Sequence, residues 1–357
     1  MVNSYKKTFR VSSFDNLIVS LYVIGYKNIG ESIILLLRDK TEEGERVVMS
    51  MVIDSYETKE LKLVCEVLKK HNVQSLNFVC WTHPHWDHSP GIDVLIKKGF
   101  HDDIVLFLPK FYYPNLTSDL LKGESEKADE IFCNIWKLVK KHPNIKEIWR
   151  TISASGDYLT NTYPMCISSD DDTESKELVF RFLTPLGCRT EKYAIPGNQI
   201  SKPNELSVSF VMSLDGYDFY FGGDAENEHV MGIDTEIIKN MRWIKVPHHC
   251  SKGAINIANN LGPRFDYAAS TVYKASGLPN KDVQNIYAKS GSLHMTQLEE
   301  VKNCHLDYEY GIIQYDYHFK KNEAFVDITT YGNAGQYYRI VPSSNKEDVA
   351  GKEDMCF

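Results

Sequence analysis

The chain has 357 residues, a formal net charge of −8 and eight cysteines. This length suits one large domain or two ordinary ones, and 43% hydrophobic with 25% charged residues is typical of a folded globular protein. The acidic charge argues against a generally basic surface that coats nucleic acid, but leaves a locally positive cleft open. The scattered cysteines form no CxxC pair, which indicates free thiols and not a disulfide framework.

The N-terminal residues are polar and lack the apolar stretch of a signal peptide. No apolar run approaches about 18 residues, so we expect no membrane span. The expected location is therefore the cytoplasm.

The first hundred or so residues alternate between strand-like and helix-like patterns. Apolar runs typical of strands cover Asn16–Gly25, Glu31–Leu37, Val47–Ile53 and Leu76–Trp81. Leu61, Val64, Cys65 and Leu68 recur at helical spacing, which predicts a helix within Glu57–Asn72. A second helix is expected over Ile92–Lys98, closed by Gly99. The stretch between them, Thr82–Gly91, is then a loop after a strand and before a helix.

The rest of the chain continues the pattern after a less regular segment. Within 101–200 we expect a strand over Ile104–Leu108, a helix over Ser125–Lys141, and an exposed polar loop over Ser168–Lys176, which is less suited to Ca²⁺ because the EF-hand spacing is absent. Further strands are expected over Leu178–Leu183, Ser207–Leu214, Tyr217–Phe221 and Arg242–Val246. Tyr308–Ile340 alternates like a hairpin or meander. The interpretation is one domain over 1–345, with an insert at about 101–200 and a flexible tail at 346–357.

The loop holds four possible metal ligands within six residues: His83, His85, Asp87 and His88. On an extended loop, residues two apart point the same way, so His83 and His85 can bind one ion. If the loop then turns, Asp87 and His88 can face a second ion, and this ligand chemistry suits Zn²⁺, Mn²⁺ or Fe. The alternative is a histidine-rich surface loop, but the cluster follows an apolar strand and not a polar tract.

Two further groups follow apolar strands in the second half. Asp224 comes after Tyr217–Phe221 and can supply a carboxylate between two ions, or be only a turn residue after two glycines. His248 and His249 follow Arg242–Val246. Adjacent side chains at a strand end point apart, so one can ligate and the other can contact substrate or donate a proton.

The run Thr82–Gly91 resembles the HxHxDH signature of the metallo-β-lactamase superfamily. The order Asp54, HxHxDH, Gly-Gly-Asp224 and then Lys245–Lys252 is similar to the hydrolase domain of competence proteins of the DNA-uptake type. The resemblance spans about residues 17–290. It implies an α/β fold, the four-layer αββα sandwich, here with the insert and an extra C-terminal β segment, and metals at the rim where strand ends meet.

The chain departs from that pattern at four places. Asn204 stands where the superfamily usually has a metal-binding histidine, so it is the candidate at that position. Cys250 replaces a glycine and is either a ligand or, more in keeping with its size, a small buried residue. Leu278 stands where the branch often has a histidine before proline, and Tyr56 replaces a small residue. His294 lies further on but does not match the pattern.

The resemblance and the ligand pattern together predict a hydrolase with two divalent ions, zinc first and manganese or iron as alternatives. Two such ions about 3.5–4 Å apart share a hydroxide and polarise the bond under attack. The expected metal ligands are His83, His85, Asp87, His88, Asp224, His248 and Asn204. Asp87 would also orient the hydroxide, while His249, or whichever of the two adjacent histidines is not a ligand, would protonate the leaving group with help from Lys252.

The leading substrate is a phosphodiester, either a small molecule or a short nucleic acid. The resemblance to the competence-protein hydrolase domain implies this substrate class, and Lys245 and Lys252 flank the histidine pair. Phe111, Tyr112 and Tyr113, next to Lys110, can stack bases but are more simply packing residues. Hydrolysis of an ester, thioester or lactone is the alternative, and a non-catalytic metal-binding scaffold or regulator is the third hypothesis. Homo-oligomerisation is open.

Overall fold

The computed structural model describes residues 5–98, 103–110, 126–152, 158–159, 161–194, 202–230, 238, 241–261, 265–298, 308–320 and 323–338. Phe111–Tyr113, Gly99 and the expected tail at 346–357 lie outside these residues. Within them, no helix combines the length and apolar character that a bilayer crossing requires.

The first sheet has eight strands in the order β18-β17-β2-β3-β4-β5-β6-β7. Its pairs are antiparallel from β18 to β4 and parallel from β4 to β7. The strands are β2 (Leu17–Tyr26), β3 (Glu31–Thr41), β4 (Gly44–Ile53), β5 (Phe78–Cys80), β6 (Val105–Pro109), β7 (Ile145–Ile148), β17 (Tyr310–Lys320) and β18 (Glu323–Gly332).

The second sheet has nine strands in the order β1-β10-β11-β12-β13-β14-β15-β16-β19 and is also mixed. The strands are β1 (Thr8–Val11), β10 (Asn161–Ser169), β11 (Ser175–Thr184), β12 (Ser209–Leu214), β13 (Tyr217–Phe221), β14 (Met241–Lys245), β15 (Tyr267–Ser270), β16 (Ser292–Met295) and β19 (Gly335–Tyr337). A separate small pair joins β8 (Thr151–Ile152) to β9 (Tyr158–Leu159).

Strand periodicity explains why the two sheets pack face to face. In β2, Leu17, Val19, Leu21 and Val23 lie in one apolar core with Phe219 and other residues of the second sheet. The intervening side chains of the same strand point to the opposite face, where residues such as Tyr22 and Ile24 pack against helices. Both faces of β2 are therefore buried, as its unbroken apolar composition indicates.

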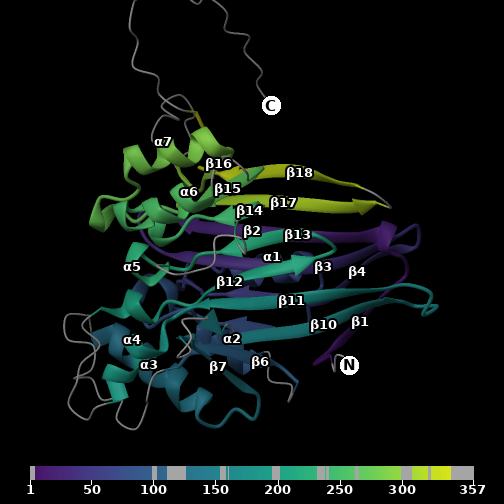
Figure 1. Ribbon diagram of the computed structural model, residues 1–357, viewed down its shortest axis with the longest axis horizontal. Helices are drawn as coiled ribbons and strands as arrows, with labels where there is room; N and C mark the ends of the chain where they lie inside the picture. Colours follow the sequence, from purple (N-terminus) through teal and green to yellow (C-terminus); the bar gives the residue numbers. More distant parts are fainter. Residues whose placement is uncertain are drawn as a thin grey trace, which may run out of the picture.

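Helices cover the outer face of each sheet. The first sheet packs against α1 (Leu63–Lys70), α2 (Ile92–Lys98) and α3 (Glu126–Val139). The second packs against α5 (Asn227–Val230), α6 (Ile255–Leu261) and α7 (Lys281–Ser290), while the short α4 (Gly187–Glu191) follows β11. The molecule is thus an α/β sandwich of two mixed sheets with helices outside them (Figure 1).

The described parts of the expected insert are largely built into the sheets. β6 and β7 extend the first sheet, and β10 and β11 lie inside the second. The expected extra C-terminal segment is likewise integrated, since β17 pairs with β2 over most of its length and β19 pairs with β16 (Figure 1). Both segments read as additions in the sequence because pairing with distant strands has no local signature.

Helix α1 and the polar loop between β10 and β11 are both shorter than the stretches that predicted them. Helix α1 begins at Leu63 and not near Glu57, because the Glu57 backbone N–H donates to Pro90 O at 2.8 Å in the histidine loop. A Glu57 carboxylate oxygen instead accepts from Cys65 N at 3.0 Å near the helix start. The polar loop expected over Ser168–Lys176 is confirmed only for 170–174, since the flanking residues continue β10 and β11.

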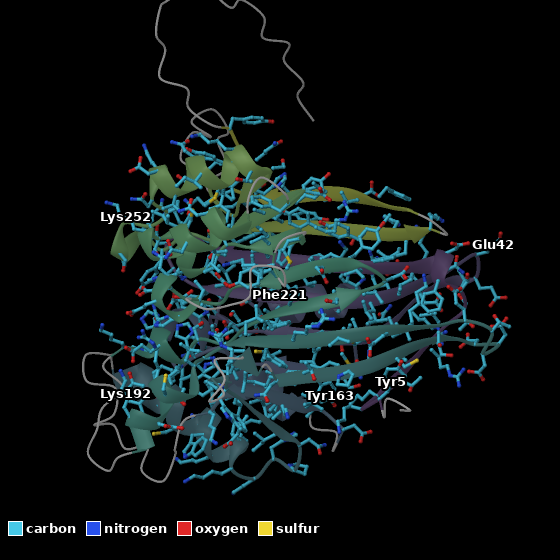
Figure 2. The ribbon with its side chains drawn as sticks, in the orientation of Figure 1. Tyr5, Glu42, Tyr163, Lys192, Phe221 and Lys252 are labelled. Carbon is cyan, nitrogen blue, oxygen red and sulfur yellow. The ribbon has the colours of Figure 1, made fainter. Side chains whose placement is uncertain are left out.

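The strand directions give the sandwich two chemically different ends. Glu42, in the turn from β3 to β4, and Lys252, beyond β14, lie at opposite ends (Figure 2). The parallel strands β4, β5, β13 and β14 all finish at the Lys252 end, where their continuations carry Asp54, the histidine loop, Asp224 and the histidine pair. The carboxyl ends of parallel strands are where binding sites of α/β proteins form.

Candidate metal centre

The histidine loop leaves β5 between two parallel neighbours and is held by its own side chains. Trp81 Nε1 donates to Ser89 Oγ at 3.0 Å, and Ser89 Oγ donates to His85 O at 2.6 Å. A single 3-10 turn, Trp86–His88, then directs Asp87 and His88 inward. The prediction of a loop at the end of a strand is confirmed.

The structure brings the loop together with Asp224 and His249 to form two adjoining ligand groups. One group is His83, His85 and Asp224, and the other is Asp87, His88, Asp224 and His249. A third possible group joins Asp54 to His83 and His88. Within each group the ligand atoms all lie within 4.8 Å of one another, and every member except His85 is buried. Asp224 belongs to both groups. These buried histidines and aspartates can hold a metal ion.

Unsatisfied polar atoms support this interpretation. Among the described residues, His83 Nε2, His88 Nε2 and both oxygens of Asp224 are buried and lack a hydrogen-bond partner. His88 Nε2 lies 3.4 Å from one Asp224 oxygen, and His83 Nε2 lies 3.8 Å from the other. Buried polar atoms are almost always paired, and an ion between these atoms would satisfy them. The donor set therefore fits a divalent cation.

Asp54, at the end of β4, fixes the orientation of two of the histidines. Its oxygens accept from Thr82 N at 2.7 Å, Thr82 Oγ1 at 2.6 Å and His88 Nδ1 at 2.7 Å. Because the Thr82 hydroxyl donates to Asp54, it accepts from His83 Nδ1 at 2.9 Å. Both rings therefore carry a proton on Nδ1 and turn Nε2 toward the cluster, which is the nitrogen that ligating histidines in this orientation use. Asp54 is a supporting residue, not a ligand.

His248 and His249 occupy a left-handed turn that separates their side chains. His248, His249 and Cys250 have φ values of 45°, 47° and 62°, a conformation that is costly for residues other than glycine. His249 is buried, with Nε2 2.8 Å from Asp87 Oδ2 and 3.9 Å from Asp224 Oδ2. His248 is partly exposed and lies 4.0 Å from Asp224. The geometry therefore places His249 in the ligand group, where the sequence favoured His248.

His248 instead contacts three polar side chains at the edge of the cluster, one of which is Ser251, whose Oγ lies 3.0 Å from His248 Nδ1. His248 Nδ1 also lies 2.8 Å from Glu226 Oε1, and its Nε2 lies 3.2 Å from Asn204 Nδ2. Asn204 thus faces His248, next to the position expected for a ligand. Glu226 raises the His248 pKa together with Asp224, against the opposing effect of burial.

Charge pairing inside the cluster keeps its carboxylates ionised. Burial alone would raise the pKa of Asp224, but the His88, His249 and His248 rings hold it well below the usual value, and His88 does the same for Asp87. Burial opposes protonation of His88, yet Asp224, Asp87 and Asp54 raise its pKa strongly. Burial and the His88 ring lower the His83 pKa. A cation would take the place of the His88 proton, since ligands must be deprotonated.

Asp54 is subject to opposing influences of the same kind. Complete burial raises its pKa, while His88 and the hydrogen bonds from Thr82 act in the other direction. The ionised form agrees best with the geometry, because a backbone N–H and a ring nitrogen both point at this carboxyl group. An ionised Asp54 keeps the ring proton on His88 Nδ1.

The lysines expected to flank a substrate have different positions. Lys245 is fully buried, and its Nζ lies 2.6 Å from Glu31 Oε2, so it does not face a substrate; this corrects the sequence interpretation. Lys252 is exposed and lies at the end of the sandwich that carries the ligand groups (Figure 2). Lys110 lies over the Trp149 ring, 4.0 Å from its centroid.

Four other residues singled out by the sequence pack outside the ligand groups. Cys250 is buried in the core beneath α6 and α7, which raises its thiol pKa and agrees with the small-residue alternative. His294 packs against Tyr267 and Tyr315 in the sandwich. Tyr56 packs against Trp86. The backbones of Leu278 and Tyr273 pair as an isolated antiparallel β-bridge.

Glu31, Thr271, Glu226 and Tyr273 are site residues that the sequence interpretation missed. Thr271 links His249 to Glu31, and the Tyr273 ring lies 5.5 Å from His249 and 6.2 Å from His85. A charged residue at the end of an apolar strand is a weak signal of a buried partner, and Glu31 at the start of β3 and Lys245 at the end of β14 carry only this weak signal. Thr271 and Tyr273 have none, because they follow an ordinary strand.

No family model and no curated protein matches the chain. The histidine motif and the geometry of the two ligand groups are therefore the features that bear on function.

Proposed function

We propose that this protein is a metal-dependent hydrolase of the metallo-β-lactamase superfamily that binds two divalent ions, zinc first, and cleaves a small phosphodiester. The observation that carries the proposal is the pair of ligand groups that share Asp224, with ligands from both halves of the chain. The αββα arrangement and the order of Asp54, the histidine loop, Asp224 and the histidine pair give further support.

When bound, two divalent ions would lower the pKa of water and neutralise the charge that develops on the phosphoryl oxygens. His83, His85 and Asp224 would hold one ion, and Asp87, His88, His249 and Asp224 the other. Asp87 also contacts His85, since its Oδ1 lies 2.7 Å from His85 Nδ1. This contact joins a residue of one ligand group to a residue of the other and fixes the position of both side chains.

Partly exposed His248 is the group best placed to protonate a leaving oxygen. It lies at the edge of the cluster and is held from behind by Glu226, so its ring is oriented without being a member of either ligand group. This exchanges the roles that the sequence favoured for the two histidines. General acid catalysis of this kind contributes about 10²–10⁴-fold.

The phosphodiester assignment rests on the competence-protein resemblance and on one remaining cation. Lys245 is committed to Glu31, so Lys252 alone of the two lysines faces solvent. A single cation and a net charge of −8 suit a nucleotide-sized substrate better than a long duplex, which needs several phosphate contacts.

Metal analysis followed by paired substrate assays tests the proposal. Protein purified without chelators or a histidine tag should contain about two Zn, Mn or Fe per chain and hydrolyse bis(4-nitrophenyl) phosphate. An Asp224→Asn variant should lose both properties, while Asp215→Asn, at a turn bound to Lys176, should keep them. Hydrolysis of 4-nitrophenyl acetate or a lactone alone would support the ester alternative. Protein that takes up no metal would contradict the proposal.

A further inference from the structure

A buried chain of polar contacts connects the two sheets behind His249. Lys245 Nζ donates to Glu31 Oε2 at 2.6 Å, Thr271 Oγ1 lies 2.6 Å from the same oxygen, and His249 Nδ1 lies 2.7 Å from Thr271 Oγ1. Glu31 begins β3 of the first sheet, whereas Lys245 ends β14 and Thr271 follows β15 of the second. All four side chains are fully buried.

Donor and acceptor chemistry gives these contacts one direction. The Glu31 carboxylate, paired with Lys245, can only accept. The Thr271 hydroxyl must therefore donate its proton to Glu31 and accept from His249 Nδ1–H. His249 Nδ1 therefore carries a proton, and Nε2, which contacts Asp87 Oδ2 at 2.8 Å, is the ring nitrogen that would bind a cation in place of that contact.

Packing alone does not account for this arrangement. A buried ion pair is costly to desolvate, and an apolar pair of similar size holds two sheets together equally well or better. Glu31 Oε1 is also buried without a hydrogen-bond partner among the described residues. The position of this carboxylate therefore does not satisfy the hydrogen bonding of both its oxygens. What the ion pair does supply is an oriented acceptor for Thr271.

The backbone of His249 is constrained together with its ring. The left-handed turn at His248–Cys250 is held from both sides, because His248 N donates to Gly223 O at 3.0 Å and Asn280 N donates to Cys250 O at 3.0 Å. Strained conformations persist when the surroundings over-determine them, and they concentrate at functional sites. Backbone and ring are thus fixed by contacts from separate elements.

We propose that Lys245, Glu31 and Thr271 form a positioning relay for His249, which sets the metal affinity of the Asp87, His88, Asp224 and His249 group separately from that of the His83, His85 and Asp224 group. The relay rests on the proposed metal-binding function, but not on the substrate. Lys245 and Glu31 orient Thr271, and Thr271 selects the ring form of His249 that can ligate.

Metal titration of a Thr271→Val variant tests the relay, because valine keeps the size of the side chain and leaves the Lys245–Glu31 pair intact. Stepwise titration of the chelator-treated full chain with Zn²⁺ should show one of two binding steps weakened about 10–100-fold, with the other unchanged. Thr271→Ser should restore wild-type affinity. Thr190→Val is the matched control, since Thr190 is a buried threonine whose hydroxyl donates to Gly187 O within α4.

A readout in the metal-free protein separates positioning from general damage. With ¹⁵N-labelled histidine, His249 should show the proton on Nδ1 in the wild type and lose this preference in Thr271→Val. If Thr271→Val fails to fold, Glu31→Gln in the full chain should give the same selective weakening. Two unchanged binding steps together with an unchanged His249 ring form would overturn the relay. Wild-type protein that binds two ions but hydrolyses no phosphodiester would contradict the proposed substrate and leave the relay supported.

Discussion

Two buried relays support the ligand histidines. Both consist of a carboxylate, a threonine and a histidine in the same order, but the residues differ. In the first, Asp54 and Thr82 orient His83 and His88. In the second, Glu31 and Thr271 orient His249. Each uses a carboxylate that accepts from a threonine hydroxyl, which in turn accepts from a ring Nδ1. The same local chemistry thus presents Nε2 to the cluster from both halves of the chain.

The difference between the relays lies in how their charge is balanced. Asp54 has no cationic lysine or arginine among its hydrogen-bond partners in the described residues and depends on Thr82 and His88. Glu31 is paired with buried Lys245 from the opposite sheet. The first relay is therefore tied to the histidine loop itself, while the second is tied to the docking of the two sheets. Substitutions in the second relay should therefore lower the free energy of unfolding as well as the affinity for metal.

Asp224→Asn is expected to have the largest effect, because Asp224 lies close to the histidines that both relays orient. Loss of its second carboxylate oxygen as an anionic ligand should abolish turnover and reduce bound metal from about two ions to about one or fewer per chain. Elemental analysis and a phosphodiester assay measure both quantities. Full turnover in this variant would show that the shared-ligand assignment is wrong.

His248→Gln asks whether a histidine outside both relays has a different role from its neighbour. Loss of a proton donor at the cluster edge should lower kcat by about 10²–10⁴-fold while metal content stays at the wild-type level. His249→Gln should lower metal content as well, because its ring belongs to a ligand group. Equal metal loss in the two variants would contradict the separation of their roles.

Lys245→Met tests the claim that only the second relay bears on sheet docking. Removing one partner of a buried ion pair leaves Glu31 uncompensated and should lower the free energy of unfolding by about 3–5 kcal/mol. Urea unfolding of the metal-free protein measures this change. The double variant Lys245→Met with Glu31→Gln should recover much of the loss, and a single-variant effect below about 1 kcal/mol would argue against a stabilising pair.

Thr82→Val is the counterpart of the Thr271 change in the first relay. Without the hydroxyl, His83 loses its Nδ1 partner, whereas His88 keeps its direct hydrogen bond to Asp54. Metal affinity in the His83, His85 and Asp224 group should therefore fall about 10–100-fold. Zn²⁺ titration should then show a weakening of the binding step that Thr271→Val leaves unchanged. The control is Thr82→Ser, which keeps the hydroxyl. If both valine variants weaken the same step, the two relays do not serve separate groups.

Lys252→Ala should have the smallest effect, because this cation is exposed and belongs to neither relay. A solvent-exposed charge contributes on the order of 1 kcal/mol or less, so KM for a phosphodiester should rise about fivefold at most, with kcat unchanged. Steady-state kinetics at low and high salt measure this. A large fall in kcat would return Lys252 to the catalytic role suggested by the sequence.

The sequence was sufficient to predict the layout of strands and the first half of the site. Apolar runs predict β13 to the residue and β2 to within one residue at each end, whereas β3 and β4 extend four and three residues beyond the predicted runs. Each of these strands is predicted from its own buried side chains. The four ligands of the histidine loop lie within six residues, so local spacing alone indicates a metal site.

Only the tertiary structure decided which distant groups hold those ligands in place. Thr271 and Glu31 are 240 positions apart, and a hydrogen bond between them leaves no periodicity in either neighbourhood. The left-handed turn exchanges the places expected for His248 and His249, since alternation along a strand does not apply there. Lys245 looked like a substrate contact until the opposite sheet brought Glu31 against it. Local patterns determine which faces are buried, whereas the docking of two sheets determines which polar groups meet between them.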